Sequence, residues 1–153
     1  MSPAQRLVAA LAMICGVLMS APAGAQSDAS PAGHIKSVSG EASIQRGDSV
    51  IPATVGAAVQ ESDVLRTGAD GSLGVTFKDS GRISIGPDTE IAVQEFVFVP
   101  RSNKMAFVTK MSRGTMQFFS GVISKLAPQK VSVITPSGTI GVRGTRFVVK
   151  VGG

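Results

Sequence analysis

The side chains that most often carry out catalysis or bind metals are scarce in this chain. It contains one histidine, His34, and one cysteine, Cys15, and it has neither tryptophan nor tyrosine. A nucleophilic triad needs a base beside its nucleophile, and zinc sites need several histidine or thiolate ligands. His34 stands beside a small, polar segment, which favours a surface position over a catalytic one. The inventory therefore predicts a protein that is not an enzyme and that binds no metal or other cofactor.

Carboxylates are the remaining candidates for chemistry. Asp70, Asp79 and Asp88 are spaced nine residues apart, and each lies in a predicted turn. Such a ladder could bind calcium in a solenoid, but calcium-binding solenoids use a denser glycine-rich nonapeptide, which this chain lacks. Two carboxylates could also act as acid and base. Each acidic residue, however, stands next to a turn residue or alternates along a strand. We therefore interpret the carboxylates as solvated surface groups.

Glycines recur every three residues within the stretch from Val131 to Val151, at Gly138, Gly141 and Gly144. Glycine tolerates positive φ angles and leaves room for a close neighbour. The spacing therefore indicates tight bends, positive φ angles or a second strand packed against the backbone.

Two arginines flank the last of these glycines. Two interpretations are open for Arg143: its guanidinium group binds an anion or a partner, or it donates hydrogen bonds to backbone carbonyls. We favour the carbonyls, because a charge within an apolar, glycine-bounded strand needs hydrogen-bond partners. Arg146 and Lys150 are expected to be exposed and are the candidates for contact with a partner. Together with Lys125 and Lys130 they form a predicted weak basic face.

The first 25 residues have the pattern of a secretory signal peptide. An almost wholly apolar run, Leu7–Met19, follows one positive charge, and Ala23 and Ala25 form an A-x-A cleavage site before Gln26. The apolar run is shorter than the roughly 20 residues that a membrane-spanning helix needs. We therefore expect cleavage near Ala25 and a periplasmic or secreted protein.

Removal of residues 1–25 takes away the cysteine and Arg6. It leaves 128 of the 153 residues, with 14 basic and 10 acidic side chains and a net charge of +4. This length predicts one domain with its own core and no disulfide. A dispersed charge of this size suits solubility and weak affinity for anionic surfaces, and it predicts no nucleic-acid partner.

The remainder of the sequence predicts an all-β domain of short antiparallel strands. Apolar and polar residues alternate in runs such as Leu73–Phe77, Ile83–Ile85 and Ile91–Val93, and turns rich in glycine and aspartate separate the runs. This regular spacing fits either a twisted, solenoid-like winding or a sandwich of hairpins.

Four segments define the predicted organisation of the chain. Residues 26–33 are small and polar and are predicted to be a disordered lead-in, so that the domain covers 34–153. Within the domain, residues 101–104 form a polar hairpin turn between two strands. Apolar residues at helical spacing indicate one short helix near 115–126, which would cap the open end of the β structure, although Gly121 disfavours it.

The segment Thr135–Thr145, Thr-Pro-Ser-Gly-Thr-Ile-Gly-Val-Arg-Gly-Thr, resembles the closing motif of the FecR domain family, the periplasmic domain of ferric-citrate-type regulators. Residues 33–40 resemble the opening strand of that domain and residues 63–68 a second landmark. The hairpin at 77–83 reads Asp-Ser-Gly in place of the more usual Asp-Gly-Ser. The resemblance implies a twisted, solenoid-like all-β fold. The motif residues are Gly138, Gly141, Arg143, Gly144 and Thr145.

The resemblance also implies a function. FecR-type regulators receive a signal from an outer-membrane transporter and pass it to a cytoplasmic sigma factor. We expect this chain to be a stand-alone exported domain that binds an envelope protein or glycan, because residues 1–25 have the pattern of a cleaved leader. The alternative is the full signalling role in iron-uptake regulation, which requires that Leu7–Met19 stay in the membrane. An enzyme acting on envelope polymers is a third class, which the residue inventory disfavours.

Overall fold

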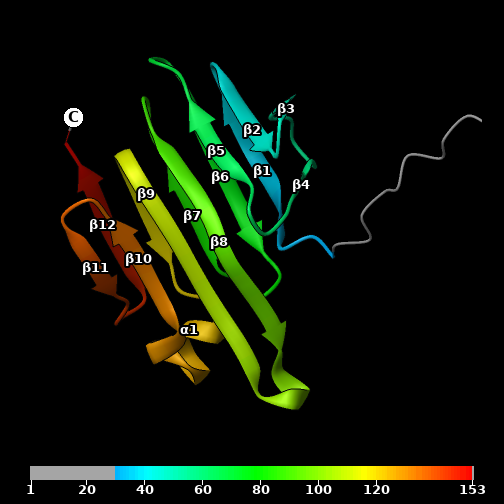
Figure 1. Cartoon of the computed structure of the whole chain (residues 1–153), viewed down its shortest axis with the longest axis vertical. Helices are drawn as coiled ribbons and strands as arrows, with labels where there is room; N and C mark the ends of the chain where they lie inside the picture. Colours follow the sequence, from blue (N-terminus) through cyan, green and yellow to red (C-terminus); the bar gives the residue numbers. More distant parts are fainter. Residues whose placement is uncertain (1–29, 153) are drawn as a thin grey trace, which may run out of the picture.

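The computed structural model describes residues 30–152, so the predicted signal peptide, residues 1–25, lies outside the described residues. The described part consists of β-strands and one short α-helix (Figure 1). The strands are β1 (Gly33–Ser39), β2 (Ala42–Arg46), β3 (Ser49–Pro52), β4 (Ala58–Val59), β5 (Val64–Thr67), β6 (Ser72–Phe77), β7 (Arg82–Ile85), β8 (Glu90–Val99), β9 (Lys104–Phe119), β10 (Val131–Thr135), β11 (Gly138–Gly141) and β12 (Arg146–Val151). The helical segments are α1 (Val122–Leu126) and the 3-10 turns η1 (Pro100–Ser102) and η2 (Pro128–Lys130).

All twelve strands belong to one sheet that is curled into a half-barrel (Figure 1). The strand order is β3-β2-β5-β8-β9-β7-β6-β1-β4, and β10 and β12 are further neighbours of β9, with β11 next to β10. Paired strands run antiparallel except β9 and β10, which are parallel. The first part of β9 pairs with β8 and β10, and its last part pairs with β7 and β12. The long strand β9 therefore belongs to both walls of the half-barrel. The front wall contains β2, β3, β5, β8, β10 and β11, and the back wall contains β1, β4, β6, β7 and β12.

The strand β9 passes from one wall to the other at Gly114. Its φ angle is +99°, and a Cβ atom at this position would overlap Thr89. The hydroxyl of Thr89 accepts a hydrogen bond from the backbone N–H of Thr115 (3.1 Å), and the backbone N–H of Thr89 donates to the hydroxyl of Thr67 (3.0 Å). Buried threonine hydroxyls thus supply partners for backbone groups at the bend, where the regular ladder is interrupted.

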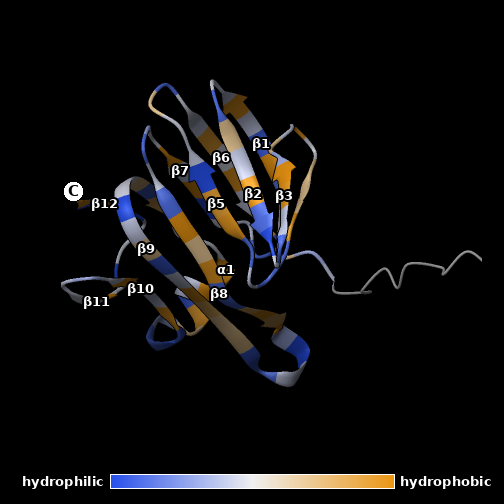
Figure 2. Ribbon diagram, turned by 45° about the horizontal axis from the view of Figure 1, so that its top comes forward, coloured by the Kyte–Doolittle hydropathy of each residue, from blue (hydrophilic) through white to orange (hydrophobic). Residues whose placement is uncertain are grey.

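Aromatic side chains link the two walls in the core. The ring of Phe107 in the front wall lies 4.6 Å from that of Phe77 and 5.5 Å from that of Phe118, both in the back wall. Phe118 in turn stacks on Phe147 of β12 at 5.0 Å. Along the strands, apolar residues alternate with polar ones (Figure 2), which places one set of side chains inside the half-barrel.

The predictions of an all-β fold and of one short helix within 115–126 are confirmed. The helix is restricted to Val122–Leu126, because residues 115–119 are the end of β9 and are paired on both sides in the sheet. The predicted lead-in is too long at its C-terminal end. Ala32 is buried and donates its N–H to the carbonyl of Val59 (2.7 Å), and β1 begins at Gly33.

The three regularly spaced aspartates do not form a ladder. Asp70 precedes β6 and Asp79 follows it, so these two turns lie at opposite ends of that strand. Asp88 follows the antiparallel strand β7 and lies at the same end as Asp70, where its N–H donates to the carbonyl of Gly68 (3.0 Å). Antiparallel hairpins alternate their turns between two ends, whereas the rungs of a solenoid would stack them.

Candidate functional site

The motif glycines lie in the β10–β11 hairpin and in the loop that leads to β12. Gly138 and Gly144 have positive φ angles of +150° and +99°, as the spacing predicted, but Gly141 does not. A Cβ atom at any of the three would have no atom within 4 Å. Of the three alternatives that the spacing left open, a second strand packed against the backbone does not apply at these glycines within residues 30–152. The physical reason is that all four residues of β11 are exposed, and among residues 30–152 this strand pairs with β10 alone.

The loop before β12 is attached to the end of β9 through its backbone. The carbonyl of Thr145 accepts a hydrogen bond from the N–H of Ser120 (2.9 Å). The hydroxyl of Ser120 donates to the carbonyl of Gly144 (2.6 Å). Two of the motif residues, Gly144 and Thr145, thus fix where β12 starts along β9, and their contribution comes from backbone groups.

Arg143 is exposed, and it forms no hydrogen bond or ion pair with any residue between 30 and 152. The prediction that backbone carbonyls hold its guanidinium group is therefore wrong. The neighbouring Val142 is buried instead and is the side chain that anchors this loop in the core. Arg143 lines a shallow hollow between η2 and β11, so its charge is available at the surface.

Arg146 and Lys150 are exposed on the outer face of β12, with Val148 between them. Their positions follow from the alternation of the strand, since Phe147 and Val149 point into the core. These two cations are the residues that the sequence singled out for contact with a partner, and the structure places both on one accessible face.

An aromatic ring supports two of the cations on the outer face of the back wall. The register places Arg82 of β7 and Arg146 of β12 on either side of Phe119 of β9. Their guanidinium carbons lie 4.9 Å and 5.9 Å from the ring centroid, within the range of cation–π attraction. Contact with the ring restricts the side-chain conformations of both arginines without neutralising their charge.

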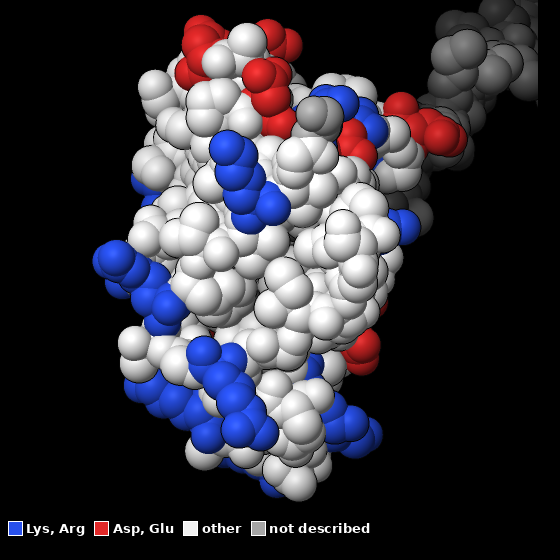
Figure 3. Space-filling view, turned by 90° about the vertical axis from the view of Figure 1, so that its left-hand side faces the viewer, with Lys and Arg blue, Asp and Glu red and all other residues white. Residues whose placement is uncertain are grey.

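The two walls remain apart on the side where β11 and β12 lie. A hollow of about 480 Å³ separates the β10–β11 hairpin from β12 and is lined by residues 135–140 and 149–152. We call the surface formed by residues 135–140 and 146–152 the seam. Figure 3 views this side of the molecule: lysines and arginines lie across its middle and lower part, whereas Asp and Glu gather at its upper end. The predicted basic residues Lys125 and Lys130 are also exposed. The seam therefore combines open sheet edges with positive charge.

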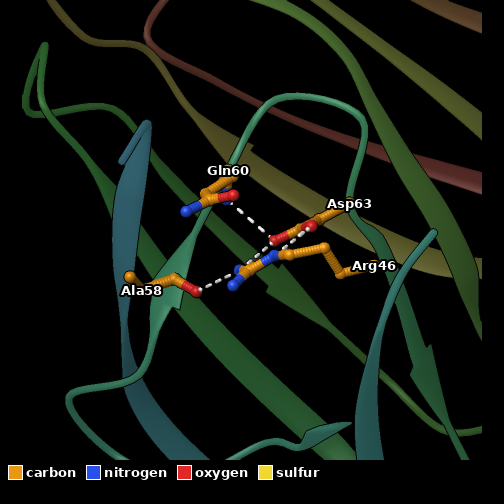
Figure 4. Close-up of polar contacts among 4 residues, drawn as sticks. All are labelled: Arg46, Ala58, Gln60 and Asp63. Atoms are coloured by element: carbon orange, nitrogen blue, oxygen red, sulfur yellow. Dashed lines mark hydrogen bonds and ion pairs between the residues drawn. The ribbon is translucent and has the colours of Figure 1, made fainter. Parts of the chain in front are cut away.

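The carboxylate of Asp63 is the main feature that the sequence interpretation missed. It is buried, with 1% of its side chain exposed, and it accepts hydrogen bonds from Arg46 Nε (2.9 Å) and Nη2 (2.7 Å) and from the N–H of Gln60 (2.8 Å) (Figure 4). Arg46 Nη2 also donates to the carbonyl of Ala58 (3.0 Å). Donation of hydrogen bonds to the Asp63 carboxylate raises the pKa of Arg46 against the opposing effect of burial. This arrangement ties β2 to the β4–β5 connection, so the role of Asp63 is structural.

Asp79 is a second buried carboxylate, and it holds α1 in place. Its Oδ1 accepts from the N–H of Gly81 (2.9 Å), its Oδ2 from the N–H of Ile123 (3.3 Å), and its backbone carbonyl from the N–H of Val122 (2.8 Å). The interpretation of the acidic residues as solvated is therefore wrong for Asp63 and Asp79. Their burial could not be inferred locally, because their donors lie up to 44 positions away in the chain.

No three His, Cys, Asp or Glu side chains within residues 30–152 come together as a group that could hold a metal ion. His34 lies exposed on β1, as predicted. The only α-helix in the same range has five residues and is too short to cross a membrane.

The fold and the seam define an all-β domain whose exposed features are sheet edges and cations. The sequence model of the family described as FecR protein matches residues 63–153. This match covers more than half of the chain, and the chain belongs to the FecR family. Strands β1 to β4 precede the match, so the resemblance of residues 33–40 to the opening strand stays a prediction. Comparisons with curated proteins and with solved structures find no match.

Proposed function

We propose that this protein is a stand-alone exported FecR domain without enzymatic activity, which binds an envelope protein or glycan in the periplasm or after secretion. The observation that carries the proposal is the seam, where two open sheet edges flank a hollow beside Arg146 and Lys150. An open edge offers unpaired backbone groups to a partner. Unpaired cations beside it favour an anionic partner and raise the rate of association.

The use of the buried ionisable groups supports a binding role over an enzymatic one. Catalytic carboxylates lie in clefts within reach of a substrate. Asp63 and Asp79 instead accept hydrogen bonds from Arg46 and from backbone N–H groups that join separate elements. Both carboxylates thus serve the fold, and the hollow at the seam is lined by neither.

The proposal is tested by retention of envelope components on the immobilised protein. The matched variants are Arg146→Glu with Lys150→Glu at the seam, and Arg101→Glu with Lys104→Glu at the exposed turn between β8 and β9. Both pairs change the net charge equally. We expect the seam variant to lose a salt-sensitive component that the parent and the turn variant retain. Equal retention by all three proteins, or no retention by the parent, would contradict the proposal.

The second candidate function is that of a transmembrane FecR-type regulator, which controls a sigma factor in the iron-uptake response. Membership of the FecR family favours it, and the apolar run Leu7–Met19 would have to remain in the membrane. Cell fractionation separates the two functions, because an exported domain is recovered in soluble envelope fractions after cleavage near Ala25 and a regulator is recovered with membranes.

A further inference from the structure

We propose that the free edge of β12 binds an extended acidic polypeptide segment as an added β-strand, which lies in the seam between the two walls. This inference rests on the proposed function and specifies the class of partner. The occupant is a protein segment in extended conformation with carboxylates spaced to meet Arg146 and Lys150. Binding by strand addition derives its affinity from backbone hydrogen bonds and its specificity from alternate side chains.

The hydrogen-bond pattern of β12 shows which backbone groups are available. In an antiparallel pair, residues alternate between those whose N–H and C=O face the partner strand and those whose groups face away. The carbonyl of Thr145 faces β9, since it accepts from Ser120. Phe147 and Val149 lie two and four positions after Thr145, so their backbone N–H and C=O groups also face β9. The N–H and C=O groups of Arg146, Val148 and Lys150 therefore point to the free edge, and among residues 30–152 β12 has no neighbour on that side.

The same three residues supply the side chains that an added strand would meet. Arg146, Val148 and Lys150 share the outer face, and Val148 is 60% exposed. Neither cation forms an ion pair with a carboxylate in the described chain, where the pairs are Arg46 with Asp63 and Arg66 with Glu90. An added strand with an apolar residue opposite Val148 and acidic residues two positions to either side would match this edge. Opposite charges in cross-strand pairs stabilise a sheet.

A second copy of this chain fits the edge poorly. If two β12 strands paired antiparallel about Val148, Arg146 of each copy would face Lys150 of the other. Like charges in such positions are destabilising, and edge cations are a common means by which proteins prevent self-pairing. The charges of β12 thus disfavour self-association and select an acidic partner.

The other sheet edges are less suited to strand addition. The edge strand β3 ends in Pro52, which lacks a backbone donor, and β4 consists of two residues. β11 has only four residues, and it begins and ends with glycine. β12 is the longest edge strand, and Ile140 of β11, at 38% exposure, faces solvent near it. An added strand would therefore pair with β12 and lie against the β10–β11 hairpin across the hollow.

The decisive variant is Val148→Pro. Proline removes the central free-edge N–H and obstructs an added strand, but it is tolerated on an edge strand where that N–H faces solvent. The matched control is Val50→Pro on β3. Val50 is also an exposed valine on an edge strand. Arg46 and Ser49 form the hydrogen-bonded pair that closes a two-residue hairpin, and Val50 belongs to the next pair along the strands. The N–H of Val50 therefore also faces away from the neighbouring strand β2. Far-UV circular dichroism and thermal unfolding establish that both variants fold.

The probe is an end-capped peptide, Thr-Glu-Thr-Val-Thr-Glu-Thr, added at millimolar concentration to the full chain in NMR titrations. We expect saturable shifts and slowed hydrogen exchange at the amides of Arg146, Val148 and Lys150. Peptide binding should weaken by about tenfold or more in Val148→Pro and should be unchanged in Val50→Pro. A peptide with lysine in place of both glutamates should also bind the parent about tenfold or more weakly. Absence of saturable shifts in the parent, or equal binding by Val148→Pro, would overturn the proposal.

Parallel measurements separate strand addition from the other occupants. An oligogalacturonate that binds as tightly to Val148→Pro as to the parent, while the peptide does not bind, would assign the face to an acidic glycan and refute strand addition. Dimerisation of the parent in sedimentation experiments, abolished by Val148→Pro, would assign the edge to a second copy and also refute it. If envelope retention depends on Arg146 and Lys150 but is unaffected by Val148→Pro, the proposed function stands and strand addition fails.

Discussion

Replacement of Asp63 by asparagine tests whether this buried carboxylate holds the N-terminal strands in place. Asparagine has the same shape, and its amide oxygen in the Oδ2 position still accepts from Arg46 Nη2 and the N–H of Gln60. Its NH₂ group then faces Arg46 Nε, which is also a donor. The variant therefore loses one charge-assisted hydrogen bond, weakens two others and leaves two donors in contact.

The expected cost follows from the burial of the two partners. Hydrogen bonds to charged groups contribute about 1.5–3 kcal/mol each, and removal of one partner from a fully buried ion pair costs about 3–5 kcal/mol. The Arg46 side chain is 33% exposed and can recover water. We therefore expect Asp63→Asn to lower the free energy of unfolding by about 2–3 kcal/mol, which corresponds to a fall in Tm of roughly 6–12 °C.

Glu90→Gln is the matched control in thermal unfolding followed by far-UV circular dichroism. Glu90 pairs with Arg66 at 2.8 Å, but the two side chains are 26% and 42% exposed. Removal of such a pair should cost less than about 1 kcal/mol, and high salt should reduce the difference further. If Asp63→Asn and Glu90→Gln lowered the Tm equally, or if Asp63→Asn melted like the parent, the reasoning from burial would be refuted.

Three further predictions test the bend, the motif and the leader. Gly114→Ala should destabilise far more than Gly144→Ala in urea unfolding, because both residues have a φ of +99° but only a Cβ at Gly114 would overlap Thr89. Backbone strain alone costs about 1–3 kcal/mol, and equal costs would show that the bend relaxes. Arg143→Ala should leave the Tm unchanged, since the side chain is exposed, and a loss above ~1 kcal/mol would restore a buried, carbonyl-bound role. The intact mass of the exported protein should match a chain that begins at or near Gln26, and recovery of a form that still contains Leu7–Met19 would favour the signalling function.

Much of the fold could be predicted because each half-buried strand shows an alternation of apolar and polar residues in its own stretch of sequence. The alternation in Leu73–Phe77 predicted that strand, and its apolar residues are indeed buried. The polar turn at 101–104 lies between β8 and β9 as predicted. The exposure of Arg146 and Lys150 could also be predicted, because side chains two positions apart on a strand share a face. These properties depend only on the conformation of the strand itself.

The glycines and Arg143 of the family motif show where local reasoning reached its limit. Positive φ angles at Gly138 and Gly144 follow from the tolerance of glycine for that conformation. Whether a second strand lies against those glycines depends on the rest of the fold, and the edge of β11 is open. The predicted carbonyl contacts of Arg143 assumed that this residue lies within an apolar strand that Gly141 and Gly144 bend around it. Residues 142–145 instead form a loop, and the side chain of Arg143 faces solvent.

By itself the sequence thus determined the all-β class, the approximate strands and the cations of β12, because each is encoded by the period of nearby side chains. Only the tertiary structure decided that Arg46 meets Asp63, that Asp79 reaches Ile123, and that β9 changes walls at Gly114. It also decided that, within the described part of the chain, β12 has one neighbour and a free edge. Such pairings join residues far apart in the chain, and their free energy depends on burial and partner geometry, for which no short stretch of sequence carries a pattern.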